Sequence, residues 1–161
     1  MSQKTIGLVF FKGTGPTAKA IQWFSAGPFS HVAALWSPAQ YLDSRDDVVG
    51  GVLPGVRIRP VEAEPDPHVI FTLPASNGQY TAWQTFLRAQ IGKPYDKPGI
   101  WGFATGRDWR EPDSWFCSEL QAAALEAANL IPALYAPANK ITPSALAIIL
   151  SAINAKSATP A

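Results

Sequence analysis

The sequence predicts an α+β domain in which an antiparallel sheet of about five strands packs against helices on one side. Short apolar runs rich in β-branched residues are confined to residues 6–73, where the connections are too short for helical crossovers between parallel strands. From residue 76 onward, apolar residues recur instead at the three- and four-residue spacing of helices. The strands are therefore expected in the first half of the chain, and most of the helices in the second.

The predicted strands differ in how deeply they are expected to be buried. The continuous apolar runs Ile6–Phe11 and His31–Trp36 are typical of buried strands. Val56–Arg59 alternates apolar and charged side chains, as expected of a half-exposed strand. Residues 46–55 are rich in Asp and Gly and are expected to form a loop or a hairpin end. Two further strands are expected at Gln40–Asp43 and Val69–Leu73.

The first two predicted helices are amphipathic. Thr17–Phe24 follows a Gly- and Pro-containing break and is expected to carry Ala20, Ile21 and Phe24 on one face. Ser76 can cap the second helix, and Gly92 is expected to end it. We interpret the apolar stripe of the second helix as its core face, formed by Tyr80, Trp83, Phe86, Leu87 and Ile91.

Two more helices are expected in the last third of the chain. One begins at Cys117, and the other begins with Thr142 as its cap and Pro143 at its first position. Residues 93–114 precede the Cys117 helix and form a long segment of Pro, Gly, Trp and charged residues. A loop of that length in a small domain is typical of the wall of a functional site.

Length and composition indicate one domain. The 161 residues suit a single domain, 1–161, with residues 155–161 as a loose tail. Hydrophobic residues make up 47% of the chain, which excludes disorder as a whole. The net charge is +1 and the basic residues are scattered, so no nucleic-acid partner is indicated. The apolar runs are too short for a signal sequence or an integral membrane segment. We therefore expect a cytoplasmic location by default, with export by another route left open.

The single cysteine and a distant histidine are the chemically most informative pair. Cys117 stands at the predicted start of a helix, where unpaired N–H groups and the helix dipole favour the nucleophilic thiolate. His31 lies far upstream, at the start of a predicted strand. Such a pair is typical of cysteine hydrolases, in which the imidazole takes the thiol proton and later delivers it to the leaving group. A lone cysteine can equally be a small buried apolar residue.

A third polar side chain is needed to hold the other ring nitrogen of His31. Asp43 lies on the next predicted strand, within one hairpin of His31, and is our first choice. The two histidines, the cysteine and the scattered acids lack metal-ligand spacing, so no metal site is expected. The alternatives for the third residue are Ser44, Asp46 and Asp47.

These motifs together resemble a known family. The segment Ser30–Val32, the strand that carries Asp43 and a following Gly-Val pair (Gly51-Val52 or Gly55-Val56) resemble the histidine half of an NlpC-type papain-like domain. Gly92–Asp96 and Phe116–Leu120 resemble its cysteine half. The histidine half comes first here, which is similar to the circularly permuted branch related to lecithin–retinol acyltransferase-like proteins. The resemblance covers roughly residues 5–150.

The resemblance implies roles for individual residues. Cys117 would be the nucleophile, His31 the general base and acid, and Asp43 the third residue, where permuted members commonly carry a glutamate. Tyr95 would lie near the thiol and help the Cys117 backbone N–H to stabilise an oxyanion. The implied reaction is thiol-dependent cleavage of an amide bond through a thioester, most plausibly in a cell-wall-type peptide of a bacterial or phage setting. The resemblance implies no metal or organic cofactor and identifies no partner protein.

Two other functions remain open. The same triad could act on a lipid or fatty-acyl ester, as the permuted relatives suggest. The fold could also serve as a binding module that does no chemistry. Three tryptophans, Trp101, Trp109 and Trp115, flank the thiol in sequence. We expect Trp101 and Trp115 either to line a substrate groove or to pack the long loop onto the domain.

Overall fold

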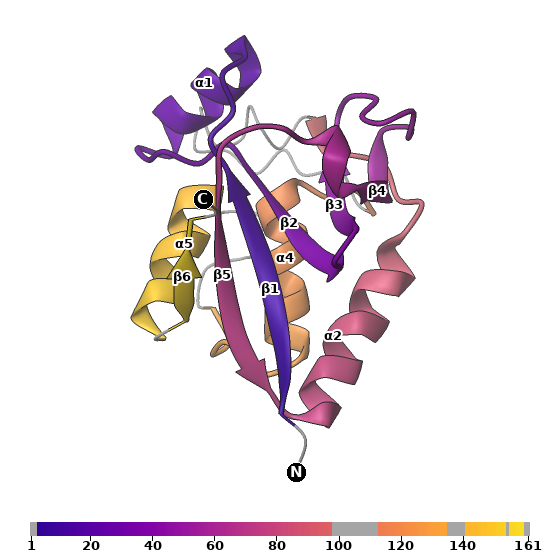
Figure 1. The fold of residues 1–161 in the computed structure, drawn as a ribbon, viewed down its shortest axis with the longest axis vertical. Helices are drawn as coiled ribbons and strands as arrows, with labels where there is room; N and C mark the ends of the chain where they lie inside the picture. The colour runs from indigo at the N-terminus through magenta and orange to yellow at the C-terminus, as the bar shows by residue number, and fades with distance from the viewer. Residues whose placement is uncertain (1–2, 98–112, 135–140, 154, 160–161) are drawn as a thin grey trace.

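The computed structural model describes residues 3–97, 113–134, 141–153 and 155–159. Its centre is an open antiparallel sheet with the strand order β4-β3-β2-β1-β5-β6 (Figure 1). Neighbouring strands are antiparallel throughout, as the short connections of the first half predict. The strands are β1 (Lys4–Phe11), β2 (His31–Ser37), β3 (Gln40–Arg45), β4 (Gly55–Pro60), β5 (His68–Ala75) and β6 (Lys156–Ala158).

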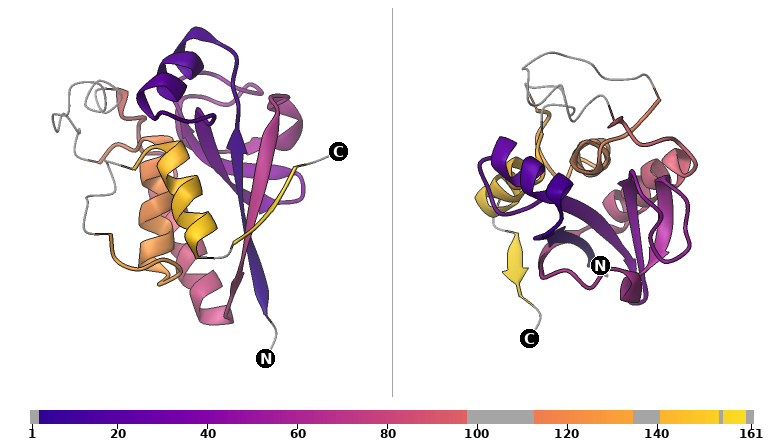
Figure 2. Two further views of the ribbon diagram at one scale, coloured as in Figure 1. Left: turned by 90° about the vertical axis from the view of Figure 1, so that its left-hand side faces the viewer. Right: turned by 90° about the horizontal axis from the view of Figure 1, so that it is seen from above.

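Helices cover one face of the sheet. In Figure 2, turned by 90° from Figure 1, α2, α4 and α5 stand together on one side of the strands, and α1 lies at one end of the sheet. Those three helices share one large core cluster with β1, β2, β3 and β5. The molecule is therefore α+β, with its helices packed as predicted. The helices are α1 (Pro16–Phe24), α2 (Asn77–Gln90), α4 (Cys117–Ala127) and α5 (Pro143–Ala152), with a 3-10 turn, η1, at Val61–Ala63.

The predicted helix ends are confirmed by the hydrogen bonds that form them. Ser76 and Gln79 make a reciprocal capping box at the start of α2, and the Thr142 hydroxyl accepts from the Ala145 N–H at the start of α5. Gly92 follows α2 with a φ of +99°, a conformation that glycine adopts without strain. These local signals define α2 and α5 independently of the rest of the fold.

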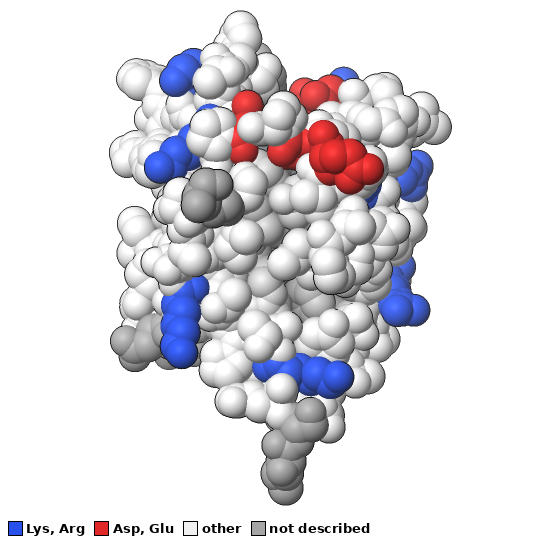
Figure 3. Space-filling view, in the orientation of Figure 1, with Lys and Arg blue, Asp and Glu red and all other residues white. Residues whose placement is uncertain are grey.

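The opposite face of the sheet carries a second, smaller cluster. Val9, Phe11, Ala33 and Tyr41 are buried there, and this cluster contains no residue of a described helix. Figure 3 shows part of this side of the molecule: acidic side chains gather in its upper half, and most of the remaining surface carries no charge.

The apolar face of α1 is only partly covered, and the expected loose tail is wrong. In α1, every residue of which is described, no side chain is fully buried; Ala20 and Phe24 are exposed, and only Ile21 of the predicted face is half-buried. α1 lies at the end of the sheet, where little apolar surface is available to cover it. Lys156–Ala158 is not a loose tail but pairs with Ile70–Thr72 as the sixth strand. Backbone pairing with the edge of β5 stabilises that strand without any hydrophobic pattern.

The apolar stripe of α2 is mostly, but not entirely, a core face. Trp83 and Leu87 are buried, and Tyr80 and Phe86 pack against the core while half-exposed. Ile91 lies just beyond the helix and is 41% exposed, contrary to the prediction. The helical periodicity ends with the helix, so the last position of the stripe turns away from the core.

Candidate active site

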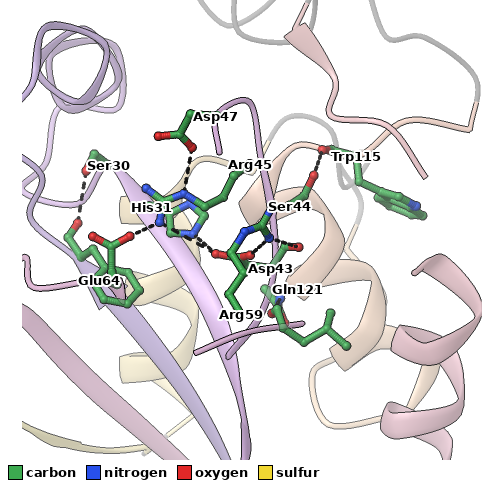
Figure 4. Close-up of polar contacts among 12 residues, drawn as sticks. Ser30, His31, Asp43, Ser44, Arg45, Asp47, Arg59, Glu64, Trp115 and Gln121 are labelled. Carbon is green, nitrogen blue, oxygen red and sulfur yellow. Dashed lines mark hydrogen bonds and ion pairs between the residues drawn. The ribbon is translucent and has the colours of Figure 1, made fainter. Parts of the chain in front are cut away.

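Three elements meet at one end of the sheet. The Ser44 hydroxyl donates to the Trp115 carbonyl at 2.6 Å, and Gln121 Nε2 donates to the Leu42 carbonyl at 3.1 Å. These two bonds hold the start of α4 against the end of β3. β2 begins at the same end, because its first residue, His31, pairs with Phe11, the last residue of β1. Figure 4 shows this junction.

Cys117 is the first residue of α4 and is only 1% exposed. The carboxylate of Glu119, three residues past the cap residue Phe116, accepts from the Phe116 backbone N–H at 3.3 Å and so orders the first turn. At this position the sulfur stands near the free N–H groups of the helix and the positive end of its dipole, which favour an anion. The sequence prediction that α4 begins at Cys117 is confirmed.

The His31 ring is held between two partners. Its Nε2 lies 2.7 Å from Asp43 Oδ2, and its side chain is 12% exposed. Burial and the charge of Arg45 lower the pKa of His31, but the charge of Cys117 and hydrogen bonds to Asp43 and Cys117 outweigh them and raise it to about 9. Because Asp43 lies at Nε2, Nδ1 is the ring nitrogen left for proton exchange with a thiol. A pKa of about 9 favours the imidazolium form of His31 at neutral pH.

The position of His31 at the very start of β2 makes this contact possible. Its ring packs 5.7 Å from the ring of Phe11, which belongs to the cluster on the face away from α4. A histidine in the middle of the strand, on that face, would be separated from α4 by the sheet. Ser30, the preceding residue, fixes the strand start by accepting from the Gly13 N–H at 3.0 Å. The ring therefore lies at the end of the sheet, where Cys117 contributes to its raised pKa.

Asp43 is 2% exposed and each of its carboxylate oxygens has a cationic neighbour. Oδ2 faces His31, and Oδ1 accepts from Nη1 of Arg59. Nη1 of Arg45 lies 4.0 Å from Oδ2. Burial raises the pKa of Asp43, but the hydrogen bond and charge of His31 and the charges of Arg59 and Arg45 together lower it. Asp43 is therefore a buried carboxylate rather than a carboxylic acid.

Tyr95 lies close to the thiol. Its backbone bridges to Trp115, with the Trp115 N–H donating to the Pro94 carbonyl at 3.1 Å, and its ring packs 5.8 Å from the ring of Phe116. Burial raises the pKa of Tyr95 above its usual value, and the charges of Cys117 and Asp46 raise it further. The phenol thus stays protonated and can donate a hydrogen bond beside Cys117.

The other candidates that the structure describes are not hydrogen-bonded to His31. Ser44 is bonded to the Trp115 carbonyl, and Asp47 lies 3.2 Å from Arg45 Nε, so Asp43 is the carboxylate in contact with His31. The Trp115 indole donates to Gln90 at 3.0 Å and packs edge-to-face on Phe86 of α2, so one side of it belongs to the helix packing. Trp101 and Trp109 lie outside the described residues.

Sequence reasoning missed the arginines around Asp43. Val56–Arg59 was expected to be half-exposed, but Arg59 is only 2% exposed. Its burial follows from the register of β3 and β4, which pairs Arg59 with Tyr41. The sequence does show an arginine on the strand that follows the Asp43 strand. Because a loop joins the two strands, the sequence does not show which residues of the two strands lie opposite each other, and so it does not show whether this arginine contacts Asp43.

A pocket of about 340 Å³ opens beside the His31–Asp43 pair. His31 and Tyr95 line it, together with Ala18 and Ile21 of α1. Arg45 bonds both Asp47 and Glu64, so it offsets only part of the negative charge. Besides His31, the charged lining residues are Arg45, Asp46, Asp47, Glu64 and Asp66.

No protein-family model matches the chain, and a search of curated proteins finds no match. Among the described residues, no group of three or more His, Cys, Asp or Glu side chains is arranged to hold a metal ion. None of the described helices combines the length and the apolar character needed to cross a membrane.

Proposed function

We propose that this protein is a thiol-dependent hydrolase that cleaves an amide bond through a thioester acyl-enzyme. The observation that carries the proposal is the position of His31 between the Asp43 carboxylate and the Cys117 thiol, with a pKa raised to about 9. We further propose that the fold is a circularly permuted NlpC-type papain-like domain. The order of the elements, with the His31 strand before the Cys117 helix, supports this assignment.

The geometry supports a two-stage reaction. The Cys117 thiolate attacks the substrate carbonyl carbon, and the resulting oxyanion accepts hydrogen bonds from the Cys117 N–H and the Tyr95 hydroxyl. The imidazolium of His31 gives its Nδ1 proton to the amide nitrogen, and the C–N bond breaks. The amine leaves, and the acyl group remains bound to the Cys117 sulfur as a thioester. Neutral His31 then takes a proton from water, whose oxygen attacks the thioester. The carboxylic acid leaves, and the thiolate–imidazolium pair is restored.

The pocket favours a peptide substrate. Four carboxylates against one guanidinium and the His31 imidazolium leave its walls net negative, so neutral or positively charged groups are accommodated better than anionic ones. A peptide with a free amino group fits that wall. This supports a cell-wall-type peptide as the substrate.

A specific observation also supports the fatty-acyl alternative. Trp23 of α1 is 77% exposed and lies edge-to-face with the neighbouring Phe24, with the ring centroids 4.9 Å apart, while Ala18 and Ile21 of the same helix line the pocket. Exposed aromatic side chains next to a site are typical of enzymes that meet lipid. The acidic pocket wall argues against a long acyl chain inside it.

Trapping the acyl-enzyme separates these functions. The protein is incubated with short peptide amides and with 4-nitrophenyl esters of increasing chain length, quenched in acid and weighed by mass spectrometry. We expect an acyl adduct on Cys117 from peptide amides, absent in Cys117→Ala. Adducts that form only from long-chain esters would favour the lipid alternative. Binding of a peptide to both proteins without any adduct or product would favour the binding module.

A further inference from the structure

Arg59 is a buried cation that the proposed chemistry does not use. Its side chain is 2% exposed, on the strand next to the one that carries Asp43. Nη1 donates to Asp43 Oδ1 and Nη2 donates to the carbonyls of Leu53, at 2.9 Å, and Gly55, at 3.2 Å. Figure 4 shows the guanidinium pointing at the carboxylate from the side away from His31. Burying an arginine is unfavourable unless it is paired, so its position needs a reason.

The two oxygens of Asp43 are divided between two partners. Oδ1 accepts from Arg59, and Oδ2 faces His31 Nε2 at 2.7 Å. Rotation of the carboxylate about its last side-chain bond would break both contacts together. Arg59 is itself anchored by two backbone carbonyls, that of Leu53 in the loop before β4 and that of Gly55 at the start of β4, so it offers Asp43 a fixed direction. The second nearby arginine, Arg45, is also bonded to Asp47 and Glu64.

We propose that Arg59 is a positioning residue of the site: it keeps the buried Asp43 carboxylate charged and turned so that Oδ2 holds the His31 ring toward Cys117. This inference rests on the proposed function, because it assigns a purpose to the orientation of His31. A charged carboxylate stabilises the imidazolium, whereas a protonated or rotated one does not. Arg59 thus acts on the reaction only through Asp43 and His31.

The test compares Arg59→Gln and Arg59→Lys with Arg57→Gln. Arg57 lies on the same strand, and its guanidinium donates to the Val56 carbonyl rather than to Asp43, so it is the matched control. The first readout is the NMR titration of His31, which needs no substrate. We expect the pKa of His31 to fall from about 9 in Arg59→Gln, to stay closer to 9 in Arg59→Lys, and not to move in Arg57→Gln.

The second readout is the rate of acyl-enzyme formation. We expect kcat to fall by about tenfold to a hundredfold in Arg59→Gln, with KM changed by less than about threefold, as for outer partners that orient a histidine. A folded Arg59→Gln protein whose His31 titrates as in the wild type would overturn the inference. If the protein shows no hydrolysis at all, the proposed function fails, while the His31 titration still decides the role of Arg59.

A third measurement covers variants that do not fold. The side-chain carboxyl ¹³C shift of Asp43 is followed against pH in the wild-type protein. We expect Asp43 to remain ionised well below its usual range, because Arg59 and His31 face its two oxygens. Titration of Asp43 at or above the ordinary aspartate value would overturn the inference without any substitution.

Discussion

Replacing Asp43 by asparagine separates the charge of the third residue from its shape. The difference between the usual pKa of histidine, 6.5, and the value of about 9 for His31 corresponds to about 3 kcal/mol in favour of the imidazolium. Asp43 and Cys117 supply this preference together, against burial and Arg45. Asparagine can still bond to the ring but removes one of the two negative charges. We therefore expect the pKa of His31 to fall from about 9 toward 6.5 or below.

The same substitution removes the charge that Arg59 faces. Removing one partner of a buried ion pair typically lowers the free energy of unfolding by about 3–5 kcal/mol, because the other charge stays buried without a partner. We expect the free energy of unfolding of Asp43→Asn to fall by an amount in that range, measured by urea denaturation. Asp47→Asn is the control, since Asp47 is 58% exposed and bonds Arg45 instead of His31.

The assay for His31 is an NMR titration of its ring protons. The chain has two histidines, so a His68→Gln protein assigns the two signals without ambiguity. The wild type and Asp47→Asn are expected to titrate at about 9, and Asp43→Asn clearly lower. A folded Asp43→Asn protein in which His31 still titrates at about 9 would refute the idea that Asp43 stabilises the imidazolium.

Three further predictions concern other parts of the structure. Tyr95→Phe is expected to slow acyl-enzyme formation by about a hundredfold while leaving the melting temperature nearly unchanged; an unaltered rate would contradict its place in the oxyanion site. Gly55→Ala is expected to lower the unfolding free energy by about 1–3 kcal/mol, because φ is +95° and a Cβ would lie 2.5 Å from a backbone oxygen. Gly51→Ala, with φ of +76° and open space around it, should cost less in the same denaturation assay, and an equal cost would contradict the steric argument. Finally, the His31–Asp43 pair should stabilise the fold most between about pH 4 and 6.5. Because the pKa of His31 is raised on folding, its contribution to the free energy of unfolding is complete below pH 6.5 and is lost as the pH rises through about 9. Because the pKa of Asp43 is lowered on folding, its contribution is complete above pH 3.8 and is lost at lower pH. The melting-temperature difference between the wild type and Asp43→Asn should therefore shrink from pH 6.5 to 9, and a constant difference would count against this linkage.

The elements that were predictable are those whose signals are local. Alternating or continuous apolar runs marked β1 to β5, and the capping residues Ser76 and Thr142 marked the starts of α2 and α5. The outward face of α1 and the strand β6 were not predictable in this way. Both depend on what surface the rest of the fold leaves available, and no periodicity encodes that.

The same division applies to the site. Cys117 and His31 could be singled out because each stands at the start of its element, and Asp43 because it lies one hairpin from His31. Arg59 could not, because its contact with Asp43 depends on how β4 registers against β3 across a loop that contains only a short bridge between Val49 and Val52. Contacts set by strand register appear only when the chain is folded.

The reactivity of Cys117 tests the central claim most directly. Cys117 is the only cysteine, so alkylation by iodoacetamide reports on it alone, and the urea-unfolded chain serves as its own free-thiol reference. A thiol that is 1% exposed should normally react more slowly when folded. We predict the opposite at pH 6: faster alkylation of the folded protein, because His31 holds the sulfur as thiolate, and loss of this advantage in His31→Gln. Slower alkylation of the folded chain, unchanged by His31→Gln, would contradict the proposed pair.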